Sequence, residues 1–305
     1  METSHGHATR EAPVEAPGEG AGRGRLSLWA KLLRDRRSLF GFCVLALMLV
    51  MSLAAPWISP FDPAEQRLLL RLQGPLVEAE PGLRCWLGTD QVGRDNLSRI
   101  IYGGRISLFV GVAAVVVGGT VGILLGLFSG YFGGRLDSII MRTADVQLSF
   151  PFILLAITII GAFGSGISKL VIVLAISGWV VYARTVRGAV LSVKEEQFVE
   201  AAVALGAMDW RIVLRHLLPN VVSPVIVIAT TQTATMILLE SALSFLGMGV
   251  PAPTPSWGRM LSDGREYLST AWWIATFPGL AIFVTVLGIN LLGDGLNDAI
   301  LSRRR

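Results

Sequence analysis

Residues 195–224 read EEQFVEAAVALGAMDWRIVLRHLLPNVVSP and form a polar island between two long apolar runs. Apolar residues recur across this island at helical spacing, which predicts an amphipathic helical element rather than a solvated linker. Gly206 interrupts the pattern, and Pro219 with Asn220 is expected to end it, so the pattern predicts two short helices joined by a bend. Asp209 is placed to cap the second helix or to favour its dipole. Such an element either lies along a lipid interface or is gripped by another protein.

The rest of the chain is apolar enough to cross a membrane several times. The 305 residues are 52% hydrophobic and 16% charged, with a mean hydropathy of +0.61. A membrane-spanning helix needs about 20 residues to cross about 30 Å of hydrocarbon. Six stretches qualify, the fourth because its arginines can snorkel; they are 39–58, 106–132, 146–168 (entered from about residue 137), 170–193, 221–249 and 267–293. The sequence therefore predicts an all-α polytopic membrane protein.

The positions of Lys and Arg predict how the chain is oriented. With the N-terminus inside, seventeen of the 26 Lys and Arg residues fall in inner segments. Six of the other nine lie in the long loop before the second span, where the rule is weakest,. Both termini and the 195–222 loop are then expected to be cytoplasmic, with Trp272 and Trp273 as anchors at the outer interface. Residues 1–38 lack a packable pattern and a signal-peptide cleavage site, and are predicted to form a disordered tail.

Polar residues inside the spans are candidates for a solute pathway. The fifth span holds four Thr residues, Gln232 and one acid, Glu240. Such residues either hydrogen-bond neighbouring helices or line a wet translocation path, and both interpretations stay open. The candidate path residues are Gln232, Thr235, Glu240 and, from the third span, Asp145. Asp145 follows Arg142 by three residues, so the two are expected to pair on one helix face.

Small residues follow one face of the second span at a four-residue step. Such a stripe lets helix backbones approach closely in lipid, and it serves either ordinary packing or a sliding surface. Its members are Ala114, Gly118, Gly122, Gly126 and Gly130.

The signatures of several enzyme and binding classes are missing from the sequence. The chain has three lysines, none of which follows a glycine, so it has no phosphate-cradling loop for ATP,. His5, His7 and His216 are too scattered for a catalytic triad or a zinc site,. Cys43 lies in an apolar run and Cys85 in a polar loop, so no disulfide is expected,. The net charge of +4 is explained by inner loops and tails rather than by nucleic-acid binding,.

The sequences of four segments resemble those of one family of membrane proteins. Glu200-Ala201-Ala202, then Gly206, then Leu218-Pro219 resembles the EAA loop of bacterial ABC importer permeases. The stretch 215–220, RHLLPN, resembles the dipeptide/oligopeptide branch of that family, whereas the general pattern has an aliphatic residue at His216. Segments 87–107, 242–258 and 291–299 resemble the C-type subunit of that branch, although Ser256 and Asn297 depart from the acid and the arginine expected there. By its own pattern, 87–107 predicts a Gly-rich turn followed by an amphipathic helix that enters the second span, and Asp90, Arg94 and Asp95 are expected to hold this loop together or to meet a partner.

The resemblance implies the type I ABC importer permease fold, with six transmembrane helices and a cytoplasmic coupling helix in the 195–222 loop. Residues 39–105 would be the first helix and a periplasmic loop, 106–298 the permease domain, and 299–305 a basic cytoplasmic tail. The implied partners are a related B-type permease, two ABC ATPase subunits and an external substrate-binding protein. ATP and Mg²⁺ would be bound by the ATPases, with no cofactor and no catalytic step in this chain. The implied location is the bacterial cytoplasmic membrane.

The resemblance also implies which residues contact the ATPase subunits and which solutes are transported. The residues expected to make the ATPase coupling contact are Glu200, Ala201, Ala202, Leu205, Gly206, Asp209, Trp210 and Arg211. The expected substrates are di- or oligopeptides, and glutathione or a nickel chelate are the alternatives within the family.

Two other functional classes remain as alternatives. A secondary transporter would use Asp145 and Glu240 as a proton relay. It would take up solute without nucleotide, and it leaves the amphipathic inner loop unexplained. A membrane scaffold would show no response to any solute.

Overall fold

The protein is built almost entirely of helices, with five of them long and apolar enough to cross a membrane. The computed structural model describes residues 35–304, with side chains described as far as residue 300, so most of the predicted 1–38 tail lies outside the described residues. The five long helices are α2 (Arg36–Leu53), α4 (Asn96–Phe132), α7 (Ile167–Lys194), α10 (Leu218–Phe245) and α12 (Trp273–Arg304). Residues 299–304, predicted as a tail, continue α12.

The predicted third span is a bent pair of helices. Helices α5 (Gly134–Leu148) and α6 (Phe152–Phe163) together are apolar enough to cross, but they meet at 89°. The span predicted over 146–168 is therefore present, but as two helices with the break at Pro151. Pro151 has no N–H to donate and disfavours helical geometry at Phe150, so the helix stops at Leu148 and restarts after the proline. With this pair counted as one crossing, the described residues contain the six predicted spans.

The polar island forms the two short helices predicted, but the second does not end at Pro219. Helix α8 (Gln197–Ala204) is followed by α9 (Asp209–Ile212), a π-helical turn η2 (Val213–Leu217) and then α10 without a break. Pro219 cannot donate to the carbonyl four residues back. In the π turn the Leu218 N–H reaches the Val213 carbonyl, and the Asn220 side chain donates to the His216 carbonyl at 2.6 Å. These contacts let the chain pass the proline as helix.

The glycine stripe of α4 is the seam against α7. A Cβ on Gly122 would lie 2.3 Å from the Trp179 carbonyl oxygen, and one on Gly126 would lie 2.6 Å from that of Ala183. Because the two backbones approach this closely, the positions accept only glycine without a shift. In this structure the stripe of small residues therefore makes ordinary helix-packing contacts.

One end of the molecule carries most of the irregular structure. Between α2 and α4 lie α3 (Ala55–Ile58), η1 (Leu68–Leu70) and a hairpin of β1 (Val77–Glu80) with β2 (Leu83–Cys85). Between α10 and α12 lie α11 (Trp257–Gly264) and η3 (Arg265–Tyr267). Asp95 caps α4 by accepting from the Ser98 N–H at 2.8 Å, so the turn and entering helix expected from the 87–107 segment are present,.

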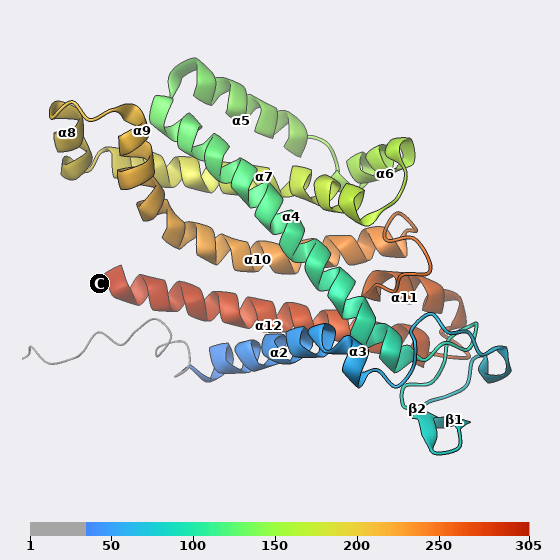
Figure 1. The fold of residues 1–305 in the computed structure, drawn as a ribbon. Helices are drawn as coiled ribbons and strands as arrows, with labels where there is room; N and C mark the ends of the chain where they lie inside the picture. The colour runs from blue at the N-terminus through green and yellow to red at the C-terminus, as the bar shows by residue number, and fades with distance from the viewer. Residues whose placement is uncertain (1–34, 305) are drawn as a thin grey trace, which may run out of the picture.

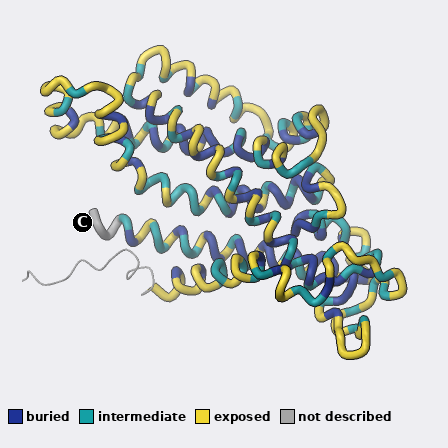
Figure 2. The backbone as a smooth tube through the Cα atoms, in the orientation of Figure 1, coloured by how far each residue is buried: buried dark blue, intermediate teal, exposed yellow. Residues whose placement is uncertain are grey.

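The two ends of the bundle differ in what they present. Figure 1 shows α8, α9, the start of α2 and the end of α12 at one end, and the hairpin with α11 at the other. Figure 2 shows burial concentrated along the middle of the bundle, with α8 and the turn after it largely exposed. Trp272 is 50% exposed, whereas Trp273 is buried and donates to the Thr89 carbonyl at 3.1 Å. The interfacial-anchor prediction is thus wrong for Trp273, because its indole fastens α12 to the loop before α4.

Candidate functional site

Helix α8 ends in a Schellman motif that fixes the bend after it. The Gly206 N–H donates to the Val203 carbonyl at 2.9 Å, and the Ala207 N–H donates to the Ala202 carbonyl at 3.1 Å. This pair of bonds needs a left-handed residue at the C′ position, and Gly206 has φ +76°,. The glycine that interrupts the sequence pattern is therefore the pivot between α8 and α9.

The inner face of this element is anchored in the bundle. Val199 of α8, Ile212 of α9 and Leu217 of η2 are buried in one apolar cluster. The same cluster holds Val186 and Val190 of α7, together with Leu127 of α4 and Val221 of α10. Because α8 and α9 are packed against three long helices, a push on them is transmitted to the bundle rather than absorbed by a loose loop.

The outer face of the element is exposed, and it holds the residues predicted for the ATPase contact. All eight are exposed except Ala202, which is half-buried; the exposed ones are Glu200, Ala201, Leu205, Gly206, Asp209, Trp210 and Arg211. The Leu205 side chain is 88% exposed and that of Trp210 is 58% exposed. Large apolar groups left uncovered in this way are typical of an interaction surface.

A groove runs beside this surface. It has a volume of about 650 Å³ and is lined by the end of α4 and by the start of α9 and η2. Its apolar walls include Phe128, Phe132, Met208, Trp210 and Leu214. The exposed outer face of α8 and α9, called the ridge below, thus lies beside a groove that can accept a complementary protein surface.

Asp209 does not cap α9 but lies in its first turn, as the dipole alternative of the prediction requires. Met208 is the N-cap residue of α9, and no side-chain hydrogen bond caps the helix. Asp209 follows as the first helical residue, where its charge suits the helix dipole, and it accepts from the Tyr131 hydroxyl at 2.6 Å,. Lys194 donates to the Tyr131 carbonyl at 2.9 Å. These bonds join the ends of α4 and α7 to the start of α9.

The candidate path residues lie in two different environments. Asp145 is exposed on α5 and forms an ion pair with Arg184 of α7, so the expected pairing with Arg142 is wrong. Arg184 projects from the neighbouring helix, which the spacing along α5 could not reveal. Gln232 is buried, and the Thr235 hydroxyl donates to the Thr231 carbonyl of its own helix at 3.1 Å.

Glu240 is enclosed between α10 and α4. Its side chain is 0% exposed and accepts from the Ser107 hydroxyl at 3.0 Å and from the Ser244 hydroxyl at 2.7 Å. Ser241 lies within 3.4 Å of the same carboxylate. These contacts are those of a polar link between helices.

A buried ionic cluster at the opposite end was only partly foreseen. Asp90 and Arg94 were expected to hold the loop together, and they do so through a contact of 2.6 Å. The cluster also contains Arg99, which contacts Asp90, and Asp263 of α11, which lies 3.2 Å from Arg99. Arg99 lies one turn inside the helix predicted after the loop, but nothing in the sequence pairs it with an acid 164 residues away.

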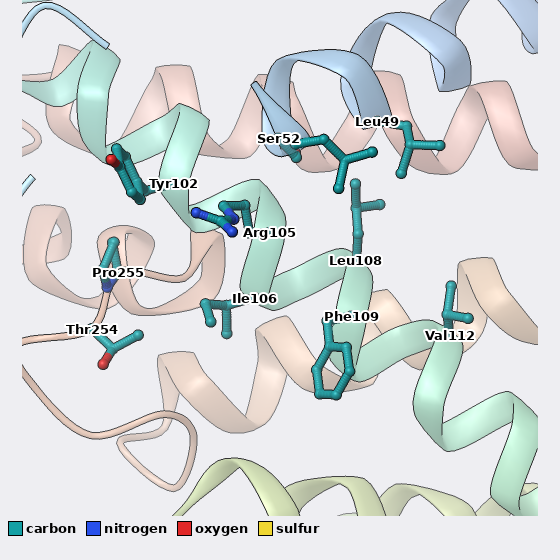
Figure 3. A pocket seen from close by; sticks show the side chains of 11 residues that line it. Leu49, Ser52, Tyr102, Arg105, Ile106, Leu108, Phe109, Val112, Thr254 and Pro255 are labelled. Atoms are coloured by element: carbon teal, nitrogen blue, oxygen red, sulfur yellow. The ribbon is translucent and has the colours of Figure 1, made fainter. Parts of the chain in front are cut away.

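An apolar cavity of about 580 Å³ opens near this cluster, between α2, α4 and the loop before α11. Figure 3 shows Leu49 and Ser52 from α2 facing Arg105 and Leu108 from α4. Thr254 closes one side of the cavity. The structure therefore has an exposed ridge at one end and cavities at the other.

Comparison with known proteins decides the family. The profile described as "Binding-protein-dependent transport system inner membrane component" matches residues 122–305, and that described as "N-terminal TM domain of oligopeptide transport permease C" matches residues 26–75. The chain belongs to the binding-protein-dependent permease family. It is a C-type membrane permease subunit of an ABC importer.

Curated relatives cover nearly the whole permease. It is 40% identical over 294 residues to the di/tripeptide transport system permease protein DppC of Pseudomonas aeruginosa, which covers 96% of this chain and 97% of that relative. It is 41% identical over 270 residues to a dipeptide permease DppC of Alkalihalophilus pseudofirmus, covering 88% and 87%. It is 43% identical over 272 residues to the glutathione permease GsiD of Escherichia coli O6:K15:H31, covering 89% and 88%.

These findings confirm the type I permease fold and a multi-pass protein of the inner membrane. They leave the proton-coupled secondary transporter without support, since the relatives are permeases of binding-protein-dependent systems. The permease is thus one component of a transport system with several parts.

Proposed function

We propose that this permease imports small peptides and is driven by two ABC ATPase subunits that dock on the α8–α9 ridge. The observation that carries the proposal is the combination of an exposed outer face at Leu205 and Trp210 with a buried base at Val199 and Ile212. An ATPase can therefore bind the exposed face of α8 and α9, and any displacement of these helices also moves the long helices on which they pack. It requires the ridge to lie in the cytoplasm, as the Lys and Arg distribution predicts.

In the proposed cycle, ATP binding closes the ATPase pair and displaces the ridge as a rigid lever. The α7–α4 seam and α10 then shift together, because the ridge packs on all three helices. The spans change from inward-facing to outward-facing, receive peptide from the external binding protein, and return after hydrolysis. ATP hydrolysis is coupled to transport only if the ATPase binds the ridge with different free energies in the inward-facing and outward-facing states.

The partners and substrate follow the same proposal. A related B-type permease completes the pathway, and ATP with Mg²⁺ is bound by the ATPases alone. Relatives carry the names of di/tripeptide, dipeptide and glutathione permeases, and all three names describe short peptides. Di- and tripeptides are therefore the proposed substrates, ahead of nickel chelates.

The coupling proposal is tested by Gly206→Val in the complete transport complex in proteoliposomes. Valine at φ +76° is strained, so the bend between α8 and α9 must change,. We expect substrate-stimulated ATP hydrolysis and uptake to fall at least about tenfold, which corresponds to about 1.4 kcal/mol of lost coupling. Membrane insertion should be unaffected.

The matched control is Gly188→Val in α7, a helical position at which an added Cβ meets nothing within 4 Å. It should leave both activities near the wild-type value. Wild-type uptake by Gly206→Val would show that the ridge does not couple ATP hydrolysis to transport.

The substrate proposal is tested on the external binding protein that co-purifies with the complex. Its melting temperature is measured with a dipeptide, with glutathione and with a nickel chelate. Stabilisation by either peptide supports the proposal, and stabilisation by the nickel chelate alone would replace it.

A further inference from the structure

A small polar cavity lies at the end of the bundle opposite α8 and α9. Its volume is about 70 Å³, which is enough for one carboxylate group,. Three arginines line it: Arg94 from the loop before α4, Arg99 from α4 and Arg259 from α11. The lining also includes Gln91, Asp263 and the loop 252–254. Segments far apart in the sequence thus bring three guanidinium groups to one point.

The carboxylates beside the cavity do not balance these arginines. Asp90 contacts Arg94 and Arg99, and Asp263 contacts Arg99 at 3.2 Å and the Arg259 Nε at 3.3 Å. Arginine stays protonated in proteins, so three positive charges face two negative ones. Asp95, the other acid of this loop, accepts from the Ser98 N–H and hydroxyl at 2.8 and 2.7 Å. Each arginine contacts a carboxylate, and Arg94 also lies 3.6 Å from Asp263, but the cluster keeps one net positive charge at a site where Arg94 is 11% and Arg99 is 2% exposed,.

Two buried polar atoms of residues that line the cavity have no hydrogen-bond partner within the described part of the chain. The Arg99 side chain is 2% exposed, and its Nε makes no hydrogen bond among the described residues. The Oε1 of Gln91 is also buried and unpartnered. The Gln91 amide can rotate by 180° at little cost, which would turn its NH₂ group to this point. The wall can therefore offer donors from Arg99, Arg259 and Gln91 to one acceptor group.

We propose that this cavity binds the carboxylate group of a small solute at the outer face of the membrane. A carboxylate supplies the missing negative charge and accepts in the planar, two-pronged manner that guanidinium groups favour. Thr254 lines both this cavity and the apolar cavity of Figure 3, so an apolar surface lies beside the carboxylate site. A short peptide has this chemistry. Its identification as the solute rests on the proposed peptide import, whereas the binding itself does not.

Binding is measured by ¹⁹F NMR with trifluoroacetate as the probe, on the full chain in lipid nanodiscs. The assay uses neither ATP nor an external binding protein, so a failure of peptide import does not affect it. We expect line broadening with wild-type protein and about tenfold weaker binding by Arg259→Gln, because one charge-assisted bond is removed. Arg259 is suited to the test since it is 32% exposed and its contact in the structure is with Asp263.

Arg265→Gln is the matched control. Arg265 follows α11, its side chain is 56% exposed, and it is not among the residues that line the cavity. Its ion pair with Glu266 is long, at 4.0 Å. This variant removes the same charge from the same end of the bundle, so it should bind trifluoroacetate as wild type does. Should Arg259→Gln fail to fold, Ala252→Leu tests the site by filling it with apolar volume, and this variant should abolish the line broadening.

The last arm identifies the source of the carboxylate. A dipeptide with a free C-terminus should displace trifluoroacetate, and the same dipeptide with an amidated C-terminus should not. The proposal is overturned if wild type gives no broadening or if Arg259→Gln and Ala252→Leu both bind like wild type. It also falls if the amidated peptide competes as well as the free acid.

Discussion

At the scale of single residues, Glu240 is a fully buried acid that links two helices. Three serine hydroxyls donate to it, one from α4 and two from α10. Leucine in its place would leave these hydroxyls unpaired inside the bundle, at about 1–3 kcal/mol for each unsatisfied group. We expect Glu240→Leu to lower the melting temperature of the purified chain in detergent, while Glu240→Gln retains most of it, since the amide oxygen can still accept. A melting temperature unchanged in Glu240→Leu would show that these bonds contribute little.

The same pair of variants separates structure from transport. If Glu240 acts as a link between helices, Glu240→Gln should leave the KM of uptake unchanged. An altered KM in a protein of normal stability would return Glu240 to the solute pathway.

Cys85 provides a prediction on reactivity. Its thiol is buried at the end of β2, and burial raises its pKa to about 12, with Asp95 adding to the effect. A raised pKa keeps the thiol protonated and unreactive at pH 7, and only above about pH 12 would the thiolate form. We expect a membrane-impermeant maleimide added to intact cells at pH 7 to leave Cys85 unlabelled.

The control places a thiol nearby. Leu83→Cys, at a 40% exposed position of the same strand, should be labelled from outside in a Cys85→Ala background. Absence of labelling until the cells are opened would contradict the proposed orientation.

At the scale of elements, the α4–α7 seam depends on glycine. A Cβ on Gly122 would meet the Trp179 backbone at 2.3 Å, and backbone cannot move aside as a flexible side chain can. We expect Gly122→Leu to destabilise the chain by about 3 kcal/mol or more, at the upper end of overpacking costs. Its neighbour Val121 is 44% exposed on the same helix, so Val121→Leu should be close to neutral. Thermal unfolding in detergent compares the two, and equal melting temperatures would contradict the seam.

Several elements were predictable from the sequence because their cause is local. Hydrophobic length located the long helices, the four-residue step located the seam, and the break at Gly206 followed from its effect on helical pattern. Pro219 shows the limit of such local rules. It was expected to stop a helix, but the π turn and the Asn220 side chain, which depend on the surrounding packing, carry the helix past it.

Contacts between distant segments were not predictable in this way. Asp145 was assigned to Arg142 by spacing along one helix, yet its partner Arg184 comes from another. The link from Arg99 to Asp263 joins residues 164 apart, and no pattern within either segment marks it. The three-arginine cavity depends on that link, so it could emerge only from the folded chain.

At the scale of the whole molecule, the two ends present different surfaces. One end presents an exposed ridge that is packed on α4, α7 and α10. The other holds the hairpin, α11 and the polar cavity, where solute is proposed to arrive. The long helices join the two, so a displacement of the ridge can alter the far end.

Site-specific photo-crosslinking in the complete complex in native membranes tests most directly whether the ridge contacts the ATPase. A benzophenone amino acid is placed at Leu205, which is 88% exposed on the ridge, or at Trp57, which is 84% exposed at the opposite end. We predict that the probe at Leu205 crosslinks to an ATPase subunit, that its yield changes when ATP is trapped, and that the probe at Trp57 gives no ATPase adduct. An ATPase adduct from Trp57, or none from Leu205, would contradict the central claim that the α8–α9 ridge receives the force of the motor.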